Sequence, residues 1–201
     1  PETIPYILNT LKNFSNNTNV HIGPISLGMH FNPYGESLVN NKKKIRLEMA
    51  DSDPRHDELF ALTWTLAIFI QSINKESKFF TFNSIYGHHG ILNKDNTKRP
   101  LYHLNNFLIS LSNSEIFKFN PVNEVYGLKI VLNDKNYYLF VNCSKQKKEI
   151  NIPEINFSNQ FKLNLKNYTD IFNNDFSFFN FKKDTNPYAF EPLEIKFIED
   201  K

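Results

Sequence analysis

The stretch DPRHDELFALTWTLAIFIQSI, residues 53–73, decides the fold class. Asp53 suits the N-cap of a helix because its carboxylate accepts backbone N–H bonds, and Pro54 suits the first turn because it has no N–H to leave unpaired. Apolar side chains then recur at helical spacing, and Trp64 and Phe69 widen the apolar face. The stretch therefore predicts a heavily buried helix that begins at Asp53 and ends near Ile73.

Strand patterns flank this helix on both sides. Residues 20–27 (VHIGPISL) alternate in polarity, with Pro24 indicating a kink, and residues 78–85 (KFFTFNSI) are rich in aromatics. A strand–helix–strand order favours two parallel strands joined by a crossover helix. Further helices are predicted over residues 4–14 and from Pro100 onward.

The pattern changes after about residue 113, where short strands separated by polar turns replace the alternation of helices and strands. Residues 133–136 (NDKN) predict the turn of a hairpin. Residues 32–52 and 167–186 show no clear element. The predicted strands cover residues 115–119, 125–132, 136–141, 147–152, 161–165 and 193–198.

The predicted fold class is therefore α/β followed by all-β. Residues 1–113 are predicted to be the last β/α units of a TIM-type (β/α)8 barrel, and residues 114–201 a C-terminal antiparallel β-sandwich. Two strands are too few to close a barrel, so we expect this chain to be the C-terminal part of a longer protein whose earlier strands are missing here.

Composition limits the classes of function. The chain has 201 residues, 40% hydrophobic residues and a formal net charge of +2, which favours a folded protein without a nucleic-acid partner. Cys143 is the single cysteine, so no disulfide forms within the chain, and a reducing, cytoplasmic location is expected. No apolar run reaches the roughly 18 residues of a membrane helix. We expect a small-molecule substrate, no membrane partner and an undetermined oligomeric state.

The loops after the two predicted parallel strands carry the candidate catalytic residues. In such barrels the active site lies at the carboxyl ends of the strands. The first loop contains His30 and Asn32, and the second contains Tyr86, His88 and His89. Histidine titrates near neutral pH and can act as acid or base, so the three histidines are the predicted catalytic residues, although each also fits a purely structural role.

Asp53 and Arg55 are further candidates for substrate binding at the rim of this face. Asp53 is also a natural helix cap, and Arg55 has the alternative of clamping the loop through nearby Asp51. Adjacent His88 and His89 point in different directions, so no shared metal is predicted. No cofactor is predicted either, because the chain has no glycine-rich phosphate loop and no zinc-binding spacing.

Four segments together resemble a known family. They are GPISL with FNP (residues 23–27 and 31–33), DPR with LFA and WTL (53–55, 59–61 and 64–66), TF with two glycines (81–82, 87 and 90), and PLYHL (100–104). Their order and spacing over about residues 20–112 resemble the D-apionate lactonase family. The departures are His30 in place of an Arg, Ser84 in place of a Glu, and His88-His89 in place of a Trp-Arg pair.

The resemblance implies a glycoside-hydrolase-like barrel with a C-terminal β domain and hydrolysis of a sugar-acid lactone in bacterial carbohydrate breakdown. Two other functions stay open. One is a glycoside hydrolase whose catalytic carboxylates lie in the missing barrel strands. The other is a non-catalytic carbohydrate-binding protein, which the changed site residues favour.

Overall fold

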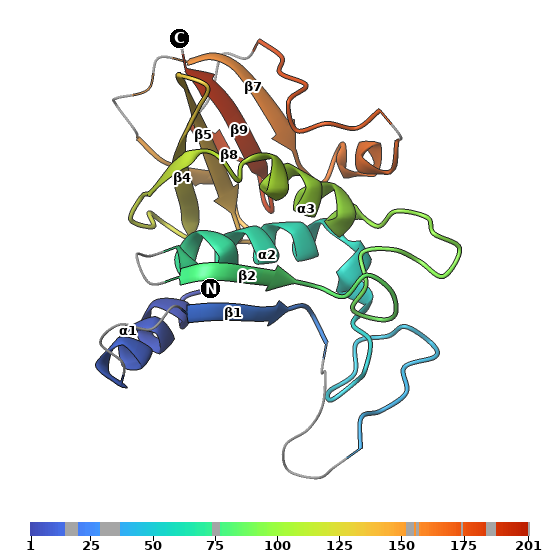
Figure 1. Cartoon of the computed structure of the whole chain (residues 1–201). Helices are drawn as coiled ribbons and strands as arrows, with labels where there is room; N and C mark the ends of the chain where they lie inside the picture. The colour runs from blue at the N-terminus through green and yellow to red at the C-terminus, as the bar shows by residue number, and fades with distance from the viewer. Residues whose placement is uncertain are drawn as a thin grey trace.

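The computed structural model describes residues 1–14, 20–28, 37–73, 77–151, 155, 157–173, 175–183 and 188–200. It is layered (Figure 1). Helices α2 (Leu59–Ser72) and α3 (Pro100–Ser110) lie between a pair of strands and a larger sheet. The pair is β1 (Val20–Ile25) with β2 (Ser77–Phe82).

Strands β1 and β2 are parallel, as the strand–helix–strand order predicts. Val20 pairs with Ser77 and Ile25 with Phe82, with register shifts on either side of the central pairs. The peptide bond between Gly23 and Pro24 is cis, at the place where the sequence predicted a kink. Both strands end sooner than predicted, and β2 ends at Phe82 because the next residue, Asn83, has a φ of 58° and leaves the extended region.

The predicted helix over residues 53–73 is in fact two helices. Pro54–Asp57 form a 3₁₀ helix capped by Asp53. The backbone of Glu58 is extended and separates this helix from α2, which begins at Leu59. From Leu59 onward almost every residue of α2 is buried, including Thr63, Thr65 and Gln71. A helix that is apolar nearly all round is packed on several sides.

The two faces of the β1–β2 pair differ. Phe80 and Phe82 lie on the side of α2, where both rings contact Phe69 edge-on. The opposite face carries His21, whose Nε2 lies 2.6 Å from the Thr81 hydroxyl, so this histidine has a partner that the sequence did not indicate. The side chain of Phe79 beside it is 63% exposed.

Helices α1 (Ile4–Phe14) and α3 largely agree with the sequence-based expectation. Helix α1 matches the predicted bounds and leaves Tyr6 and Ile7 exposed. Helix α3 begins at Pro100, as predicted, and buries Leu101, Leu104 and Phe107.

Residues after 113 form an antiparallel sheet with strand order β3-β4-β5-β9-β7. Its strands are β3 (Glu115–Lys118), β4 (Val125–Leu132), β5 (Lys135–Asn142), β7 (Phe157–Leu163) and β9 (Ile195–Asp200). The β4–β5 turn has two residues rather than four, because Asn133 and Asp134 both adopt positive φ and Leu132 pairs with Lys135.

A separate two-stranded ribbon accompanies the sheet. It pairs β6 (Lys148–Glu149) with β8 (Ala189–Phe190), and β8 was not predicted. The unassigned stretch after residue 167 contains the 3₁₀ helix η2 (Tyr168–Phe172). Within the described residues, the all-β part is thus one five-stranded sheet and one ribbon.

One hydrophobic cluster joins the helices to the sheet. It contains Leu66 and Ile70 of α2, Leu104 of α3, and Leu139 and Phe197 of the sheet. The other face of the sheet has a smaller cluster that includes Phe190 of the ribbon. Because the main core is shared, α2 and α3 support both the strand pair and the sheet. No helix within the described ranges combines the length and apolar character needed to cross a membrane.

The shared core predicts a large loss of stability on truncation of Leu104, which is completely buried. Leu104→Ala should lower the free energy of unfolding by about 2–5 kcal/mol, because it removes buried apolar surface and leaves a cavity. Urea unfolding measures this. Ile109→Ala on the same helix is the matched control, because that side chain is 67% exposed and its loss should cost no more than about 0.5 kcal/mol. Equal losses for the two variants would contradict this description of the core.

Candidate active site at the ends of the parallel strands

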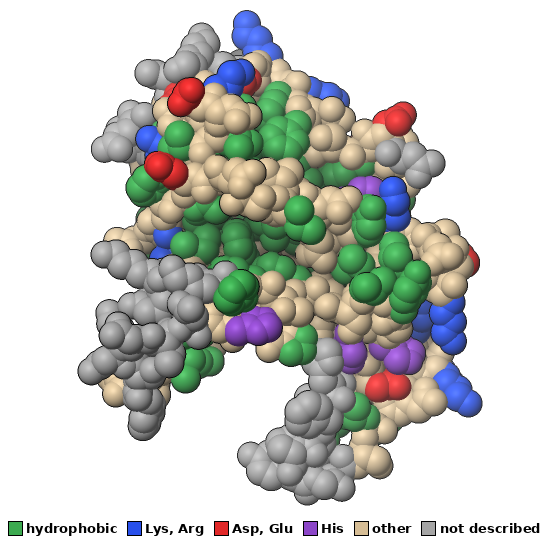
Figure 2. Space-filling view, in the orientation of Figure 1, with side chains coloured by type: hydrophobic (Ala, Val, Ile, Leu, Met, Phe, Trp, Pro, Cys, Tyr) green, Lys and Arg blue, Asp and Glu red, His purple; other side chains and the backbone are tan. Residues whose placement is uncertain are grey.

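The carboxyl ends of β1 and β2 bring two loops to one edge. The backbone N–H of Asn83 donates to the carbonyl of Ile25 at 3.1 Å, so the residues that follow both strands start side by side. Histidines and a carboxylate gather near this edge on the surface seen in Figure 2, at the lower right. We call the surface formed by residues 27–28, 51–57, 83–90 and 99 the strand-end face.

His89 ties the two loops together. Its Nδ1 lies 2.9 Å from the carbonyl oxygen of Leu27, and the side chain is half-buried. Its ring approaches Gly28 so closely that a Cβ there would lie 3.0 Å from a ring carbon, and the φ of Gly28, 91°, also favours glycine. His89 therefore has a fixed position between the loops.

His88 points to solvent beside a carboxylate. Its Nε2 lies 3.7 Å from Oδ2 of Asp51, and its side chain is 62% exposed. The other oxygen of Asp51 accepts the backbone N–H of Asn41 at 3.2 Å, which fixes the carboxylate. An exposed imidazole next to an anchored carboxylate is able to accept a proton from a water molecule or a substrate.

Asp53 and Arg55 bind each other. Oδ1 of Asp53 accepts the backbone N–H of Arg55 and its Nε, each at 2.9 Å, and a second guanidinium N–H donates to Oδ2. Hydrogen bonds from Arg55 lower the pKa of Asp53, and the same contact raises the pKa of Arg55. The guanidinium also lies 4.8 Å from the centre of the Phe60 ring. The arginine thus clamps Asp53, whereas the sequence indicated Asp51.

The remaining predicted site residues are Tyr86, His30 and Asn32. The Tyr86 hydroxyl donates to Oδ1 of Asn96 at 2.8 Å, within its own loop, and the ring is largely exposed. His30 and Asn32 lie outside the described residues. The structure therefore brings His88 and His89 to one face with the Asp53–Arg55 pair.

His56 is a buried histidine of this face that the sequence did not single out as a site residue. Its Nε2 lies 2.9 Å from the carbonyl oxygen of Gly90, while Nδ1 has no partner among the described residues. Burial lowers the pKa of His56, and the positive charge of Arg99 lowers it further, so the neutral imidazole is favoured. A Cβ at Gly90 would lie 2.5 Å from the backbone of Tyr86, so glycine is required there.

Arg99 was also missed, because it lies outside the loop motifs. One guanidinium nitrogen donates to the carbonyl oxygens of Gly87, His88 and Gly90 at 3.2–3.4 Å. Its Nε donates to Asn93 and lies 3.3 Å from the carboxylate of Asp57. Arg99 therefore shapes the backbone that carries His88 and His89.

Asn83 is the third residue that the sequence did not indicate. Its side chain is 7% exposed, and neither of its amide atoms has a partner among the described residues. A buried polar group without a partner costs about 1–3 kcal/mol. At the end of β2, this amide is a candidate for contact with a water molecule or a substrate oxygen.

Two hollows open on the strand-end face. One of about 230 Å³ is lined by Gly28, Arg46 and Asp53 among others. Another of about 30 Å³, room for one water molecule, lies beside His56, His88 and Arg99. Both include Ser52, Asp53 and Pro54, so they are neighbours.

The described residues contain no cluster of three or more His, Cys, Asp or Glu side chains that could hold a metal ion. Cys143 lies away from this face, and its thiol donates to the carbonyl of Thr63 at 3.1 Å. Burial raises the pKa of Cys143 to about 12, so it is unsuited to act as a nucleophile near neutral pH.

Comparison with known proteins identifies relatives of this chain. The family model described as the D-apionate lactonase TIM barrel domain matches residues 1–113. A D-apionate lactonase from Brucella anthropi is 30% identical over 107 residues, which are 50% of this chain and 18% of that protein. The chain thus spans less than a fifth of this curated relative.

Solved structures share the fold at low sequence identity. A conserved exported protein from Bacteroides fragilis matches 98% of this chain and 42% of its own, with a TM-score of 0.57 and 7% identity. A GH30 endoxylanase from Clostridium papyrosolvens matches 72% of this chain and 39% of its own, with a TM-score of 0.50 and 10% identity. At such low identity these likenesses concern the fold alone.

The burial of His56 predicts that stability depends on pH. Its pKa is lowered in the folded state from an ordinary value of 6.5, as is that of His103, which is half-buried on α3. At pH values below 6.5 the unfolded chain therefore binds more protons than the folded chain. The contribution of these two histidines to the free energy of unfolding is fully present above pH 6.5 and is lost as the pH falls through their folded pKa values. Urea unfolding from pH 8 to 5.5 should show this fall, with at most about 1.4 kcal/mol per pH unit from each histidine.

Replacing the histidines should flatten this dependence. His56→Gln and His103→Gln should each reduce the slope, and the double variant should lose most of it. A double variant with the slope of the parent protein would show that other groups cause the dependence.

Proposed function

The chain belongs to the D-apionate lactonase family, and from this premise we propose that it is part of a hydrolase that opens the lactone ring of a sugar acid. The proposal rests above all on the exposed His88–Asp51 pair on the strand-end face. The fold supports it as well, because catalytic residues of barrel enzymes lie at the carboxyl ends of the strands.

The reaction needs a base and a means of stabilising negative charge. A water oxygen bonds to the lactone carbonyl carbon while a base takes a proton from the water. The ring C–O bond then breaks, and the leaving alkoxide receives a proton, so that the products are a carboxylic acid and a free hydroxyl group. Hydrogen-bond donors stabilise the oxyanion that forms between these steps.

His88 is our candidate for the base, with Asp51 as its orienting carboxylate. The 3.7 Å separation in the free protein is longer than a good hydrogen bond, as is common before a substrate binds. Arg99 acts on His88 through the backbone, and His89 acts on the loop through Leu27, so both are positioning residues.

The other predicted residues keep roles around this base. We propose that Asn32, Tyr86 and the Asp53–Arg55 pair contact hydroxyl or carboxylate oxygens of the substrate. His30 stays a candidate for proton transfer. The buried amide of Asn83 is a further candidate donor to a substrate oxygen, because its hydrogen-bonding capacity is unused among the described residues.

We also propose that β1–α2–β2–α3 are consecutive units of a (β/α)8 barrel and that the sheet and ribbon belong to a β-sandwich. In support, the face of the strand pair opposite α2 carries His21, Thr81 and the exposed ring of Phe79. In a closed barrel this face is the interior, where further strands would cover it.

The assay for this function uses the protein at its native length. His88→Ala should lower kcat/KM for D-apionolactone roughly 100-fold or more, since a general base contributes about that much. Asp51→Asn should lower it less and shift the pH profile, because the imidazole keeps its place but loses the neighbouring charge. His103→Ala is the control: it should lower the melting temperature and leave the turnover of the folded fraction near normal.

Three outcomes would count against the proposal. Full activity in His88→Ala would remove this residue from the reaction. Cleavage of xylo-oligosaccharides without lactone hydrolysis would favour the glycoside hydrolase alternative. Binding of saccharides without turnover of either substrate would favour the non-catalytic alternative.

A further inference from the structure

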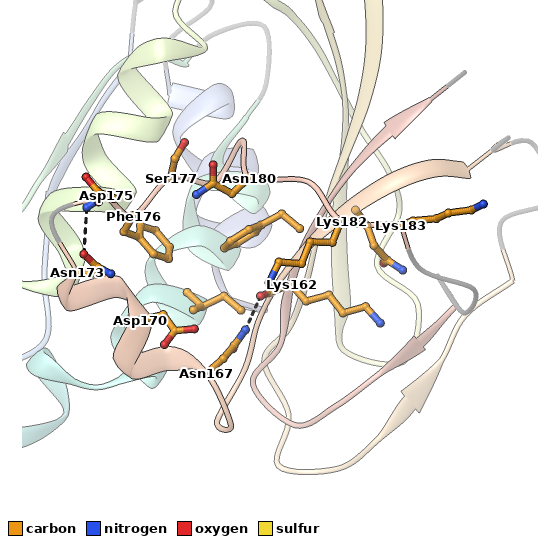
Figure 3. A pocket seen from close by; sticks show the side chains of 13 residues that line it. Lys162, Asn167, Asp170, Asn173, Asp175, Phe176, Ser177, Asn180, Lys182 and Lys183 are labelled. Atoms are coloured by element: carbon orange, nitrogen blue, oxygen red, sulfur yellow. Dashed lines mark hydrogen bonds between the residues drawn. The ribbon is translucent and has the colours of Figure 1, made fainter.

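A further cavity lies in the C-terminal part of the chain. It has a volume of about 480 Å³ and opens between β7, η2 and residues 175–183 (Figure 3). This volume falls in the range of small-molecule sites. None of its lining residues belongs to either hollow of the strand-end face. We call it the η2 cleft.

Aromatic rings form part of the wall of the η2 cleft. Phe161 and Phe176 both line it and meet edge to face, with ring centres 5.7 Å apart. Phe176 also contacts His103 on α3 and Phe178, and Phe161 is only 9% exposed. These rings are fixed by the core behind them, so the cleft offers a preformed apolar surface.

Two asparagines hold the polar wall in shape. The Asn167 amide donates to the carbonyl of Lys162 at 2.9 Å and accepts the backbone N–H of Asn164 at 2.8 Å. Oδ1 of Asn173 accepts the backbone N–H of Asp175 at 3.3 Å. The backbone of this wall is thus stabilised by its own side chains.

The two carboxylates of the cleft are not used by the fold in the same way. Figure 3 shows Asp170 and Asp175 on the side of η2, opposite Lys162 and Lys182, while Lys183 extends away. The carboxylates of Asp170 and Asp175 have no hydrogen bond or ion pair within the part of the chain that the structure describes. Their acceptor capacity is therefore available to a ligand.

Gln160 gives an independent indication. It lines the cleft and is 4% exposed, yet its Oε1 has no partner among the described residues. Its backbone is fully paired with that of Lys182, so the strand holds the residue in place. Burying an acceptor without a partner is unfavourable, and a rotation of the Gln160 side chain toward a donor in the cleft would remove that cost.

We propose that the η2 cleft binds a neutral saccharide. Adjacent hydroxyl groups of a sugar donate to carboxylate and amide oxygens and accept from an ammonium group, and the C–H face of the ring packs on an aromatic side chain. The cleft offers these groups together in Asp170, Gln160, Lys182 and Phe176. Two carboxylates face two lysines across the cleft, while Lys183 extends away, so the walls do not select for an anionic ligand. The inference rests on the lining of the cleft and not on the proposed lactonase activity.

The test is a titration of the 201-residue chain with xylotriose, maltotriose and sodium gluconate. Binding is measured by isothermal titration calorimetry and by changes in the amide chemical shifts in NMR spectra. We expect saturable binding of a neutral oligosaccharide, with the largest shifts at Asn167, Asp170 and Phe176. Asp170→Asn should weaken binding at least 10-fold, because it exchanges a charged acceptor for a neutral one. Phe176→Leu should weaken it as well by removing the aromatic face.

The matched control is Asp134→Asn, the same exchange in the exposed β4–β5 turn, which should leave the affinity unchanged. His88→Ala should also leave it unchanged, so failure of this proposal and failure of the proposed hydrolase are distinguishable. Thermal melts of each variant confirm folding. The proposal is overturned if neither neutral oligosaccharide shows saturable binding, if gluconate alone binds, or if Asp170→Asn and Asp134→Asn bind equally well.

Discussion

The burial of α2 is the constraint on which the rest of the structure depends. Its apolar side chains surround the helix almost completely, so no single layer could remove them from water. The strand pair covers it through Phe80 and Phe82, and the five-stranded sheet shares its core on another side. The hydrophobic effect therefore requires both layers at once.

This constraint also fixes the strand-end face. The residues that precede α2 enter a fixed helix, so Asp53, Arg55 and His56 have little freedom of position. The bond of His56 to Gly90 then connects the start of this helix region to the loop after β2, and Arg99 holds the same loop from the start of α3. Burial of one helix thus sets the geometry of a polar surface at its end.

Much of the fold follows from local patterns in the sequence. The parallel pair, the position of α3 and most sheet strands are set by alternation, by Pro100 and by turn residues, and all of these act within a few residues. The break at Glu58 could not be predicted, because Asp53-Pro54 is a good start for either kind of helix. The short strand β8 was missed because its pairing with β6 depends on a partner 40 residues away.

The site was predictable to a smaller extent. Histidines at the ends of predicted strands could be found from topology alone, and His88 and His89 do lie there. His56, Asn83 and Arg99 were missed as site residues because their importance comes from long-range contacts with backbone atoms or from burial, which no motif records. The partner of Arg55 was misjudged for a related reason: Asp51 and Asp53 both lie within one helical turn of Arg55 in sequence, and only the cap geometry selects Asp53.

The three histidines of the strand-end face fall into two groups, according to the partners of their ring nitrogens. His56 and His89 each direct a ring nitrogen at a main-chain carbonyl, so each imidazole is engaged in shaping a loop. His88 has a mostly exposed ring and a carboxylate as its neighbour, so its proton can exchange with water or substrate. A general base needs both properties at once: a scaffold that does not move and a ring that is free to take a proton. Under the proposed function, His56, His89 and Arg99 supply the first property, and His88 supplies the second.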